Sequence, residues 1–530
     1  MAAVLLMAAL VSPAAAQVER PKLVVGIVVD QMRWDYLYRF NARYGEGGFR
    51  RMLGEGFSFE NCRIPYIPSV TAVGHTSIFT GSVPAIHGIA GNNFYLDGHE
   101  VYCTDDATVS PVGSDSKAGL MSPRNMLATT IGDELRIATN NRSRVIGVSI
   151  KDRASILPAG HSANGAFWFD DQTGLFITST FYMTELPEWV LAFNKQKNPD
   201  ALLSKKWDLL LDPATYTEST PDDAPFENGI RTGVAPTLPL DLPALKKKYG
   251  YSIIRSTPMG NTLTRLMAEA AIEGEQLGRH QDTDMLTVSF SCTDYLGHQV
   301  GPNALEIEDM YIRLDLELAH LFDTLDKTVG KGQWTAFLTA DHGAQNSTSY
   351  LLDRKIPAGV WSGREARQNL NANLKEITGQ DNLVADVMNY QVFFNRARID
   401  SLGLNYADIK AAAADCLMRD SRVLAAWDQE KTMTTTLPAD VQTRATNGYF
   451  RGRSGDVQVI LRPAFSSHGL LGTSHGVWNP YDTHIPLLFL GWGVNHGATT
   501  RPVFMTDIAA TVCAMLHIQA PDGCVGTPLF

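Results

Sequence analysis

The sequence predicts an α/β fold in which a mostly parallel central sheet is flanked by helices. Three features predict it: apolar runs rich in β-branched residues, helical patterns between those runs, and polar side chains where most of the runs end. Runs that are continuously apolar are typical of strands buried on both faces, as in a parallel sheet. Strands that alternate with helices along a chain indicate an α/β architecture.

The predicted strands come first in this argument because they position everything else. They span residues 23–30, 144–151, 285–294, 335–341 and 485–490. The first four runs end in polar residues, which are Asp30, Lys151, Asp294 and Asp341. Ligands bind outside the carboxyl ends of the strands in open parallel sheets, so we expect these four side chains to project to one edge.

Helical patterns lie between and after the strands. Residues 261–273 and 306–322 carry the helical period, and residues 72–81 are expected to begin a further helix. A last helix is expected over residues 506–517, with Thr506 as its capping residue.

The domain organisation follows from the spread of the candidate site residues. A chain of 530 residues would suggest about three domains on length alone. The candidate residues run from position 30 to position 475 and must converge in space, so we predict a single domain over residues 17–530. Insertions over the site are expected at about residues 165–250 and 345–465. The second of these contains a helical pattern at 406–416 and a strand pattern at 456–462.

The first residues look like an export signal. Residues 1–16 combine a short apolar run with the small-residue site Ala14–Ala16 before Gln17. The run is shorter than the roughly 20 apolar residues that span a bilayer, and no other segment qualifies. We therefore expect signal-peptide cleavage and a soluble periplasmic or secreted protein without a membrane span, and we expect a monomer.

Composition argues against nucleic acid as a partner, and it does not decide whether the cysteines form disulfides. The net charge is −11 and the densest basic cluster, Lys246–Lys248, is explained by a solvated helix face. Nucleic-acid binding is therefore not expected. The six cysteines match no zinc-binding spacing. Disulfides between Cys62 and Cys103 and between Cys513 and Cys524 are as plausible as free thiols.

Six side chains that can hold metal lie scattered along the chain. They are Asp30, Asp294, His298, Asp341, His342 and His475. Asp294 and His298 are four apart, and Gly297 between them could allow a turn; His475 lies in a small-residue turn. Zinc accepts aspartate and histidine readily, and a catalytic zinc site keeps one position open. Each motif alone is weak, but three aspartates and three histidines would suffice for two metal ions.

Taken together, these motifs resemble the alkaline phosphatase superfamily. Within it, the chain is similar to the phosphate-irrepressible, single-chain alkaline phosphatases exported by Gram-negative bacteria, relatives of the nucleotide pyrophosphatase/phosphodiesterases. The resemblance covers most of the chain and implies an alkaline-phosphatase-like fold with two Zn²⁺ per chain. The residues that match the second-zinc site are Asp30, Thr71, Asp341 and His342. Those that match the first-zinc site are Asp294, His298 and His475.

The resemblance also implies a nucleophile. Thr71 matches the family nucleophile in Thr-Ala-Val-Gly-His, where related phosphodiesterases carry Thr-x-Pro-x-His. Asn92 matches the asparagine that contacts a phosphoryl oxygen. A zinc ion beside Thr71 would lower the pKa of its hydroxyl and so activate it. By chemistry alone three nearby hydroxyls are rivals, those of Ser69, Thr76 and Ser77. His75 and His87 are expected to be structural, and His468 is the alternative to His475.

The substrate class depends on a basic pair. A phosphate monoester carries two negative charges and a diester one, and Lys151 with Arg153 could supply the charge that a dianion needs. The pair resembles that of the monoesterase branch, where the two residues and the Asn92 equivalent hold the transferred group. A solvated basic turn is the alternative. Residues 168–170 could form a wall of the same pocket.

These expectations define one function and two alternatives. We predict an exported, zinc-dependent alkaline phosphatase that hydrolyses small-molecule phosphate monoesters through a covalent phospho-threonine at Thr71 and releases inorganic phosphate. One alternative is a phosphodiesterase of the nucleotide type. The other is an exported metal-binding protein without catalytic activity.

Overall fold

A large mixed sheet forms the centre of the molecule. The structure is a computed structural model that describes residues 19–530, so the predicted signal peptide at 1–16 lies outside the described residues. The strands of the ten-stranded sheet are, in spatial order, β22 (Gly497–Thr499), β2 (Phe57–Phe59), β21 (Leu487–Gly491), β13 (Trp334–Thr339), β1 (Leu23–Val29), β12 (Asp284–Phe290), β7 (Val145–Ser149), β8 (Gly165–Asp170), β9 (Leu175–Ser179) and β6 (Pro111–Val112).

Five neighbouring strands in the middle of this sheet are parallel, and the apolar runs predict four of them, all but β8. They are β13, β1, β12, β7 and β8. Every residue of β1 is buried, and its Val25 lies between Leu286 and Ala336. The predicted α/β fold is therefore confirmed. One direction was wrong: β21 pairs antiparallel with β13, because continuous apolarity reports burial on both faces and not strand direction.

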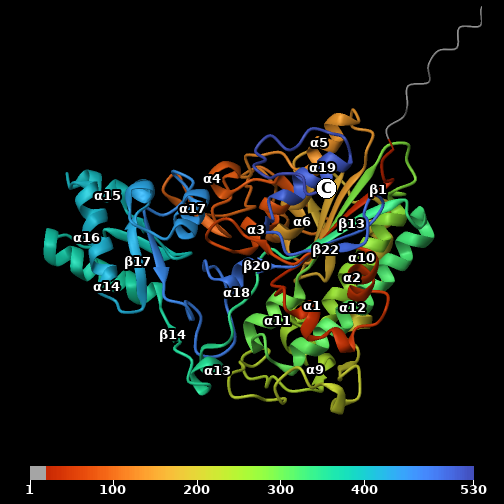
Figure 1. The fold of residues 1–530 in the computed structure, drawn as a ribbon, viewed down its shortest axis with the longest axis horizontal. Helices are drawn as coiled ribbons and strands as arrows, with labels where there is room; N and C mark the ends of the chain where they lie inside the picture. The colour runs from red at the N-terminus through yellow and green to blue at the C-terminus, as the bar shows by residue number, and fades with distance from the viewer. Residues whose placement is uncertain (1–18) are drawn as a thin grey trace, which may run out of the picture.

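Helices cover both faces of the sheet (Figure 1). On one side lie α3 (Thr71–Thr80) and α6 (Asp152–Ala159), and on the other α10 (Pro258–Gly274) and α12 (Leu305–Leu325). Helices α3, α10, α12 and α19 (Asp507–Met515) lie close to their predicted positions, whereas α6 was not predicted. The expected cap of α19 is wrong, because Thr506 has helical backbone angles and its side chain makes no capping hydrogen bond.

The first insertion begins later than the sequence suggests. Strands β8 and β9 belong to the central sheet, so the excursion starts after Ser179 rather than at about residue 165. The run in β8 was missed because it is short and aromatic rather than β-branched. The remaining segment carries α7 (Glu188–Lys195), α8 (Asn198–Leu202) and α9 (Leu242–Tyr249), and its long loops lie at the lower edge of Figure 1.

The second insertion forms a separate small lobe, seen at the left of Figure 1. A four-stranded sheet of β15 (Val384–Met388), β16 (Gln391–Phe394), β18 (Val457–Leu461) and β17 (Val423–Asp428) packs with α14 (Gly363–Thr378) and α16 (Tyr406–Met418). The lobe has an apolar core of its own, including Leu370, Leu374 and Val392. The helix and strand expected near 406 and 456 are both present.

The six cysteines are all free thiols in the structure, so neither of the two possible disulfides is formed. Cys62 begins β3 (Cys62–Arg63) in a three-stranded sheet with β20 (His484–Ile485) and β23 (Val503–Phe504), whereas Cys103 follows the hairpin of β4 (Asn93–Leu96) and β5 (His99–Tyr102). Within residues 19–530, no helix is both long enough and apolar enough to cross a membrane.

Candidate active site

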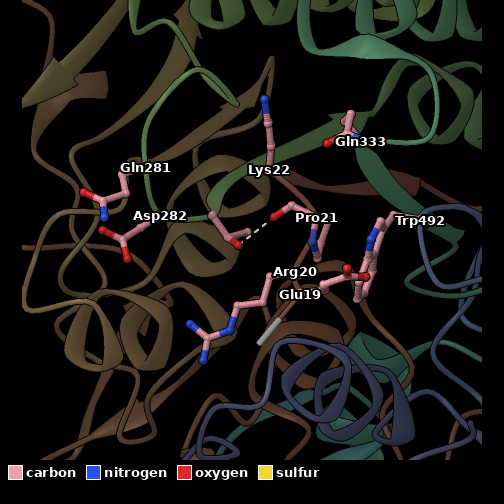
Figure 2. A pocket seen from close by; sticks show the side chains of 9 residues that line it. Glu19, Arg20, Pro21, Lys22, Gln281, Asp282, Gln333 and Trp492 are labelled. Atoms are coloured by element: carbon pink, nitrogen blue, oxygen red, sulfur yellow. Dashed lines mark hydrogen bonds between the residues drawn. The ribbon is translucent and has the colours of Figure 1, made fainter. Parts of the chain in front are cut away.

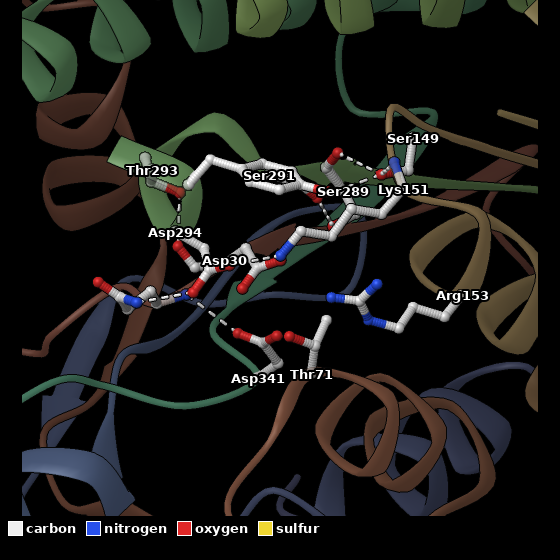
Figure 3. Close-up of polar contacts among 12 residues, drawn as sticks. Asp30, Thr71, Ser149, Lys151, Arg153, Ser289, Ser291, Thr293, Asp294 and Asp341 are labelled. Carbon is white, nitrogen blue, oxygen red and sulfur yellow. Dashed lines mark hydrogen bonds and ion pairs between the residues drawn. The ribbon is translucent and has the colours of Figure 1, made fainter. Parts of the chain in front are cut away.

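The predicted ligands come together at the carboxyl edge of the parallel strands, and Figure 3 shows the three aspartates among them, Asp30, Asp294 and Asp341. Asp30 directly follows β1, and Asp341 and His342 follow β13. Ligand atoms of these three residues all lie within 4.8 Å of one another. The same holds for Asp294, His342 and His475, so His342 is common to both groups.

Asp294 reaches this place from a helix and not from a strand end. β12 stops at Phe290, and Asp294 lies in the first turn of α11 (Cys292–Val300). His298 is therefore one helical turn further on, on the same face, and its Nε2 lies 3.1 Å from Asp294 Oδ1. The turn expected at Gly297 is not formed. The run 285–294 mixes strand and helix, which its apolar pattern could not separate.

The three predicted histidine ligands are all oriented by a backbone carbonyl. Each ring places Nδ1 on a backbone carbonyl: His298 on Thr473 at 2.9 Å, His342 on Gly343 at 3.0 Å and His475 on Ser69 at 2.8 Å. A carbonyl can only accept, so Nδ1 carries the proton and the Nε2 lone pair is directed to the carboxylates. Metal-ligating histidines are typically oriented in this way.

The carboxylates of the site are buried without full compensation. Asp30 and Asp341 have no exposed surface, and Asp30 Oδ1 and Asp341 Oδ2 accept no hydrogen bond from any residue in 19–530. Burial, and then the neighbouring charge of Asp341, raise the pKa of Asp30 well above its usual range. Burial also opposes ionisation of Asp341, but His342 and His75 hold its pKa low.

This donor set fits bound divalent cations. Unpaired carboxylate oxygens and Nε2 lone pairs that converge in a buried place repel one another unless a cation lies between them. Aspartate and imidazole ligands in two groups that share one edge suit zinc in particular.

Lys151 supplies one positive charge to this place. Its buried Nζ lies 2.6 Å from Asp30 Oδ2 and 2.6 Å from Asp294 Oδ2 (Figure 3), and 4.7 Å from the centre of the Tyr295 ring. Burial opposes the charge, but Asp294 and Asp30 raise the pKa of Lys151 above its ordinary value. In this structure Lys151 is thus the counter-ion of two predicted metal ligands, a contact that the sequence did not predict.

Thr71 is the first residue of α3 and lies beside the ligands. Its buried Oγ1 is 3.5 Å from His342 Nε2. The backbone N–H of Ala72 donates to Asn92 Oδ1 at 2.8 Å, which places Asn92 at the same helix end. The N–H groups of a first helical turn, together with the helix dipole, favour a bound anion.

The rival hydroxyls are engaged elsewhere. Ser69 Oγ donates to the carbonyl of Val477 and Thr76 Oγ1 to that of Ala72, while Ser77 Oγ lies 3.1 Å from His87 Nε2. Each of these hydroxyls thus has a partner outside the two ligand groups, which favours Thr71.

Two further histidines also have defined partners. His75 lies in α3 rather than in a turn; its Nδ1 is 2.9 Å from the Thr71 carbonyl and its Nε2 is 2.8 Å from Ser289 Oγ. The His468 ring centre lies 6.0 Å from that of His298, at the margin of the ligand group.

Arg153 approaches the same centre from α6. Its guanidinium extends toward the space between Lys151 and Thr71 (Figure 3), and Nη1 donates to the Tyr102 hydroxyl at 2.9 Å. Beside Lys151 and Arg153 lies a cavity of about 440 Å³ whose wall includes Trp168 and Phe169. The wall expected from residues 168–170 is therefore present in part.

Gln31 is the functional residue that the sequence analysis missed. Its backbone N–H donates to Asp341 Oδ1 at 3.1 Å and its Nε2 donates to Asp294 Oδ1 at 2.6 Å, so it links the two ligand groups. Gln31 has a φ of 64°, and a Cβ at Gly297 would collide with its Oε1. A left-handed glutamine has no sequence signal, although its place directly after Asp30 is suggestive.

A second cavity lies at the opposite, amino-terminal edge of the strands (Figure 2). It measures about 710 Å³ and is lined by residues such as Arg20, Asp282 and Trp492. It contains none of the predicted site residues, so the chemistry is concentrated at the carboxyl edge.

Comparison with known proteins supports the same reading. A family described as type I phosphodiesterase / nucleotide pyrophosphatase matches residues 24–482. The chain belongs to this family. Within this phosphodiesterase family it is 50% identical over 516 residues to alkaline phosphatase PafA of Elizabethkingia meningoseptica, covering 97% of this chain and 94% of that protein. It is 49% identical over 523 residues to alkaline phosphatase PhoV of Synechococcus elongatus, covering 96% and 92%.

Solved structures of the family agree with the fold. The crystal structure of wild-type PafA superposes with a TM-score of 0.94 at 50% identity and covers 97% of this chain and 99% of that one. A PafA variant substituted at a threonine, an asparagine, a lysine and an arginine gives the same values. The predicted fold, superfamily and phosphoester-hydrolysing enzyme are confirmed.

Proposed function

We propose that this chain is an exported, zinc-dependent phosphomonoesterase that forms a covalent phospho-threonine at Thr71 and releases inorganic phosphate. The observation that carries the proposal is the meeting of two Asp/His ligand groups at the amino end of α3, whose first residue is Thr71. The alkaline phosphatases PafA and PhoV, each about half identical to this chain, support it.

The residues divide between two metal positions. Asp30, Asp341 and His342 would hold one zinc ion beside Thr71, and Asp294, His298 and His475 the other. Bound zinc would supply positive charge for the phosphoryl oxygens and lower the pKa of the attacking hydroxyl.

The chain itself provides the nucleophile and the grip on the substrate. Thr71 Oγ1 gives up its proton to water and attacks phosphorus while the bond to the leaving-group oxygen breaks. That oxygen leaves with the electron pair and takes up a proton from water. A water molecule then loses a proton and attacks the phosphorus of phospho-Thr71. Oγ1 leaves with the electron pair of its bond to phosphorus and is reprotonated, and inorganic phosphate is released. The N–H groups of α3, with Asn92 and Arg153, would hold the equatorial oxygens throughout.

The basic pair supports a monoester rather than a diester. Lys151 and Arg153 lie at the site. With metal ions on Asp30 and Asp294, Lys151 would no longer be needed as their counter-ion, and together with Arg153 it would match the extra charge of a monoester dianion. The four positions substituted in the PafA variant are a threonine and an asparagine, then a lysine and an arginine. Within each pair their separation equals that of Thr71 and Asn92, and of Lys151 and Arg153.

A comparison of aryl phosphates tests the proposal. Hydrolysis of a mono-aryl and a bis-aryl phosphate is measured for the wild type, Thr71→Ala and Lys151→Ala/Arg153→Ala, before and after chelation. We expect mono-aryl turnover to dominate, to vanish on chelation and to return with zinc. Thr71→Ala should lower kcat by about 1,000-fold or more, since it removes the attacking atom. Thr76→Ala, one turn further along α3, is the matched control.

Several results would contradict the proposal. Faster bis-aryl turnover in the wild type would favour the phosphodiesterase alternative. Loss of only diester activity in Lys151→Ala/Arg153→Ala would remove the role of the basic pair. A zinc-supplied protein that hydrolyses no phosphate ester would be the inert metal-binding alternative.

Export and a monomeric state also belong to this proposal. The leader-like residues 1–16 support export. The expected product of signal-peptide cleavage is a mature protein that begins at Gln17. Amino-terminal sequencing of the protein from the periplasm or medium, with size-exclusion chromatography, tests both.

A further inference from the structure

The cavity beside Lys151 and Arg153 holds more positive charge than the transferred phosphoryl group needs. The cavity has a volume of about 440 Å³. Its wall contains four basic side chains, Lys151, Arg153, Arg231 and Arg255, and two acidic ones, Asp152 and Asp171. A cavity of this size lies within the range of small-molecule sites.

Three of the basic side chains already have partners. Lys151 is held between Asp30 and Asp294. Arg255 is engaged through all three of its nitrogens: Nε donates to Asp171 at 2.6 Å, Nη1 to the Tyr295 hydroxyl at 2.9 Å and Nη2 to the Phe169 carbonyl at 3.1 Å.

The acid nearest to Arg153 is only loosely paired with it. Asp152 Oδ1 lies 4.0 Å from Arg153 Nη1 and accepts from the Tyr102 hydroxyl at 2.6 Å. Arg153 itself is assigned above to the phosphoryl group. The two acids of the wall are thus bound to partners of their own and do not neutralise the fourth cation.

That fourth cation is Arg231, in the loop between α8 and α9. Its guanidinium donates a single hydrogen bond within the described part of the chain, from Nη2 to the Ser252 carbonyl at 2.9 Å. No carboxylate oxygen among residues 19–530 lies within 4.0 Å of the Arg231 side-chain nitrogens. An arginine that lines a cavity with most of its N–H groups unused is suited to bind an anion.

We propose that this cavity binds the leaving group and that Arg231 selects substrates whose leaving group carries a second anionic group, such as a carboxylate. The inference rests on the proposed phosphomonoesterase function. The Tyr295 ring lies 4.7 Å from Lys151 Nζ and 5.4 Å from Arg255 Cζ and lines the same cavity as Arg231, so it offers an aromatic face to the leaving group. The favoured substrates are therefore phosphate monoesters of acids rather than of neutral alcohols or phenols.

The test compares phenyl phosphate with carboxyphenyl phosphate in the zinc-loaded full-length enzyme. We expect the wild type to favour carboxyphenyl phosphate in kcat/KM by about tenfold, as one charge-assisted hydrogen-bonded pair allows. Arg231→Gln should abolish this preference and leave phenyl phosphate turnover unchanged, and Arg231→Lys should keep part of it. Arg279→Gln, on the surface, is the matched control.

The outcomes separate the two proposals. Equal kcat/KM for the two substrates in the wild type, or an unchanged preference in Arg231→Gln, would overturn the subsite while phenyl phosphate turnover still supports the phosphomonoesterase. An equal loss for both substrates in Arg231→Gln would also overturn it, because a selecting residue must act on the carboxylate alone. Failure to hydrolyse phenyl phosphate would count against both.

Discussion

At the scale of single residues, the site is built from side chains whose second contacts fix them. Three histidines are oriented by carbonyls of Thr473, Gly343 and Ser69, which belong to three different loops. The tautomer of each ring is thereby set by the backbone rather than by the metal. Such a site is pre-organised, so its affinity for zinc should depend on residues that never touch the ion.

Gln31→Ala tests that dependence. Gln31→Ala keeps the backbone N–H that donates to Asp341 but loses the Nε2 that donates to Asp294. Asp294 is then free to rotate, and we expect zinc affinity to fall by about tenfold or more. Competition with a chelator measures the change. Gln276→Ala is the matched control, because Gln276 also has a positive φ but lies exposed on the surface. Equal losses in the two variants would mean that backbone strain, and not the ligand contacts, is responsible.

Glu227 gives a prediction about pH. Burial, and then the nearby Asp222 and Asp223, raise the pKa of Glu227 to about 8 in the folded state. The folded protein then holds a proton that the unfolded chain has lost, so the stability falls as pH rises from about 4.5 to about 8. Glu227→Gln cannot ionise and should gain Tm relative to the wild type over this window, with a constant difference above it.

Thermal melts between pH 5 and pH 9 measure this difference. Glu185→Gln, at an exposed position, controls for the loss of one negative charge. A Tm difference between Glu227→Gln and the wild type that does not grow with pH would show that Glu227 keeps its ordinary pKa.

At the scale of elements, the contact between α3 and the loop after β13 sets the distance from Thr71 to the ligands. A Cβ at Gly74 would lie 2.6 Å from Asp341 Cβ, so the helix packs as closely as a glycine permits. We expect Gly74→Ala to push α3 away, to lower kcat by about tenfold or more and to reduce Tm, since misplacement of about 1 Å can cost 100-fold.

Gly54→Ala is the matched control for that variant. Gly54 lies in α2 (Phe49–Glu55), and nothing within 4 Å would meet its Cβ. There the higher helix propensity of alanine should raise the stability by up to about 1 kcal/mol. Retained activity in Gly74→Ala would show that α3 and the Asp341 loop are not rigidly coupled.

The same elements show which parts of the structure could be predicted from the sequence. The parallel strands and the convergence of Asp30, Asp341 and Asp294 could be predicted, because burial on both faces leaves a continuous apolar run and strand ends share an edge. The helix that bears Asp294 could not, since the apolar run continues across the strand end. Strand direction in β21 and the later start of the first insertion depend on long-range pairing, which no local pattern records.

The contacts of Lys151 and Gln31 could not be predicted from the sequence for a different reason. A basic residue at a strand end can serve a phosphate or a carboxylate, and only the folded structure shows that the carboxylates of Asp30 and Asp294 lie within reach of Lys151. The possible disulfides failed in the same way: sequence spacing does not fix the Cα–Cα distance that an S–S bond requires.

At the scale of the whole molecule, the site joins residues that are far apart in the sequence. The small lobe is inserted in the chain between two groups of ligands. Asp341 and His342 precede the lobe and His475 follows it. The loop with His475 is nevertheless tied to the main domain, because His475 bonds to the Ser69 carbonyl and Thr473 to His298. The lobe should therefore be able to open without dismantling the site.

Leu370→Ala tests this independence. Leu370 is fully buried in the core of the lobe, and its truncation should cost about 2–5 kcal/mol there. We expect proteolytic cleavage within residues 363–461 to begin at a lower temperature, because the lobe opens locally before the whole protein unfolds. Phosphatase activity at 25 °C should stay close to that of the wild type.

The control lies in the same helix. Ile377, also in α14, is 60% exposed, so Ile377→Ala should leave both the cleavage temperature and the activity unchanged. If Leu370→Ala loses activity and zinc in parallel with lobe opening, the lobe and the site unfold as one unit, and the backbone ties of the His475 loop are too weak to hold that ligand on their own.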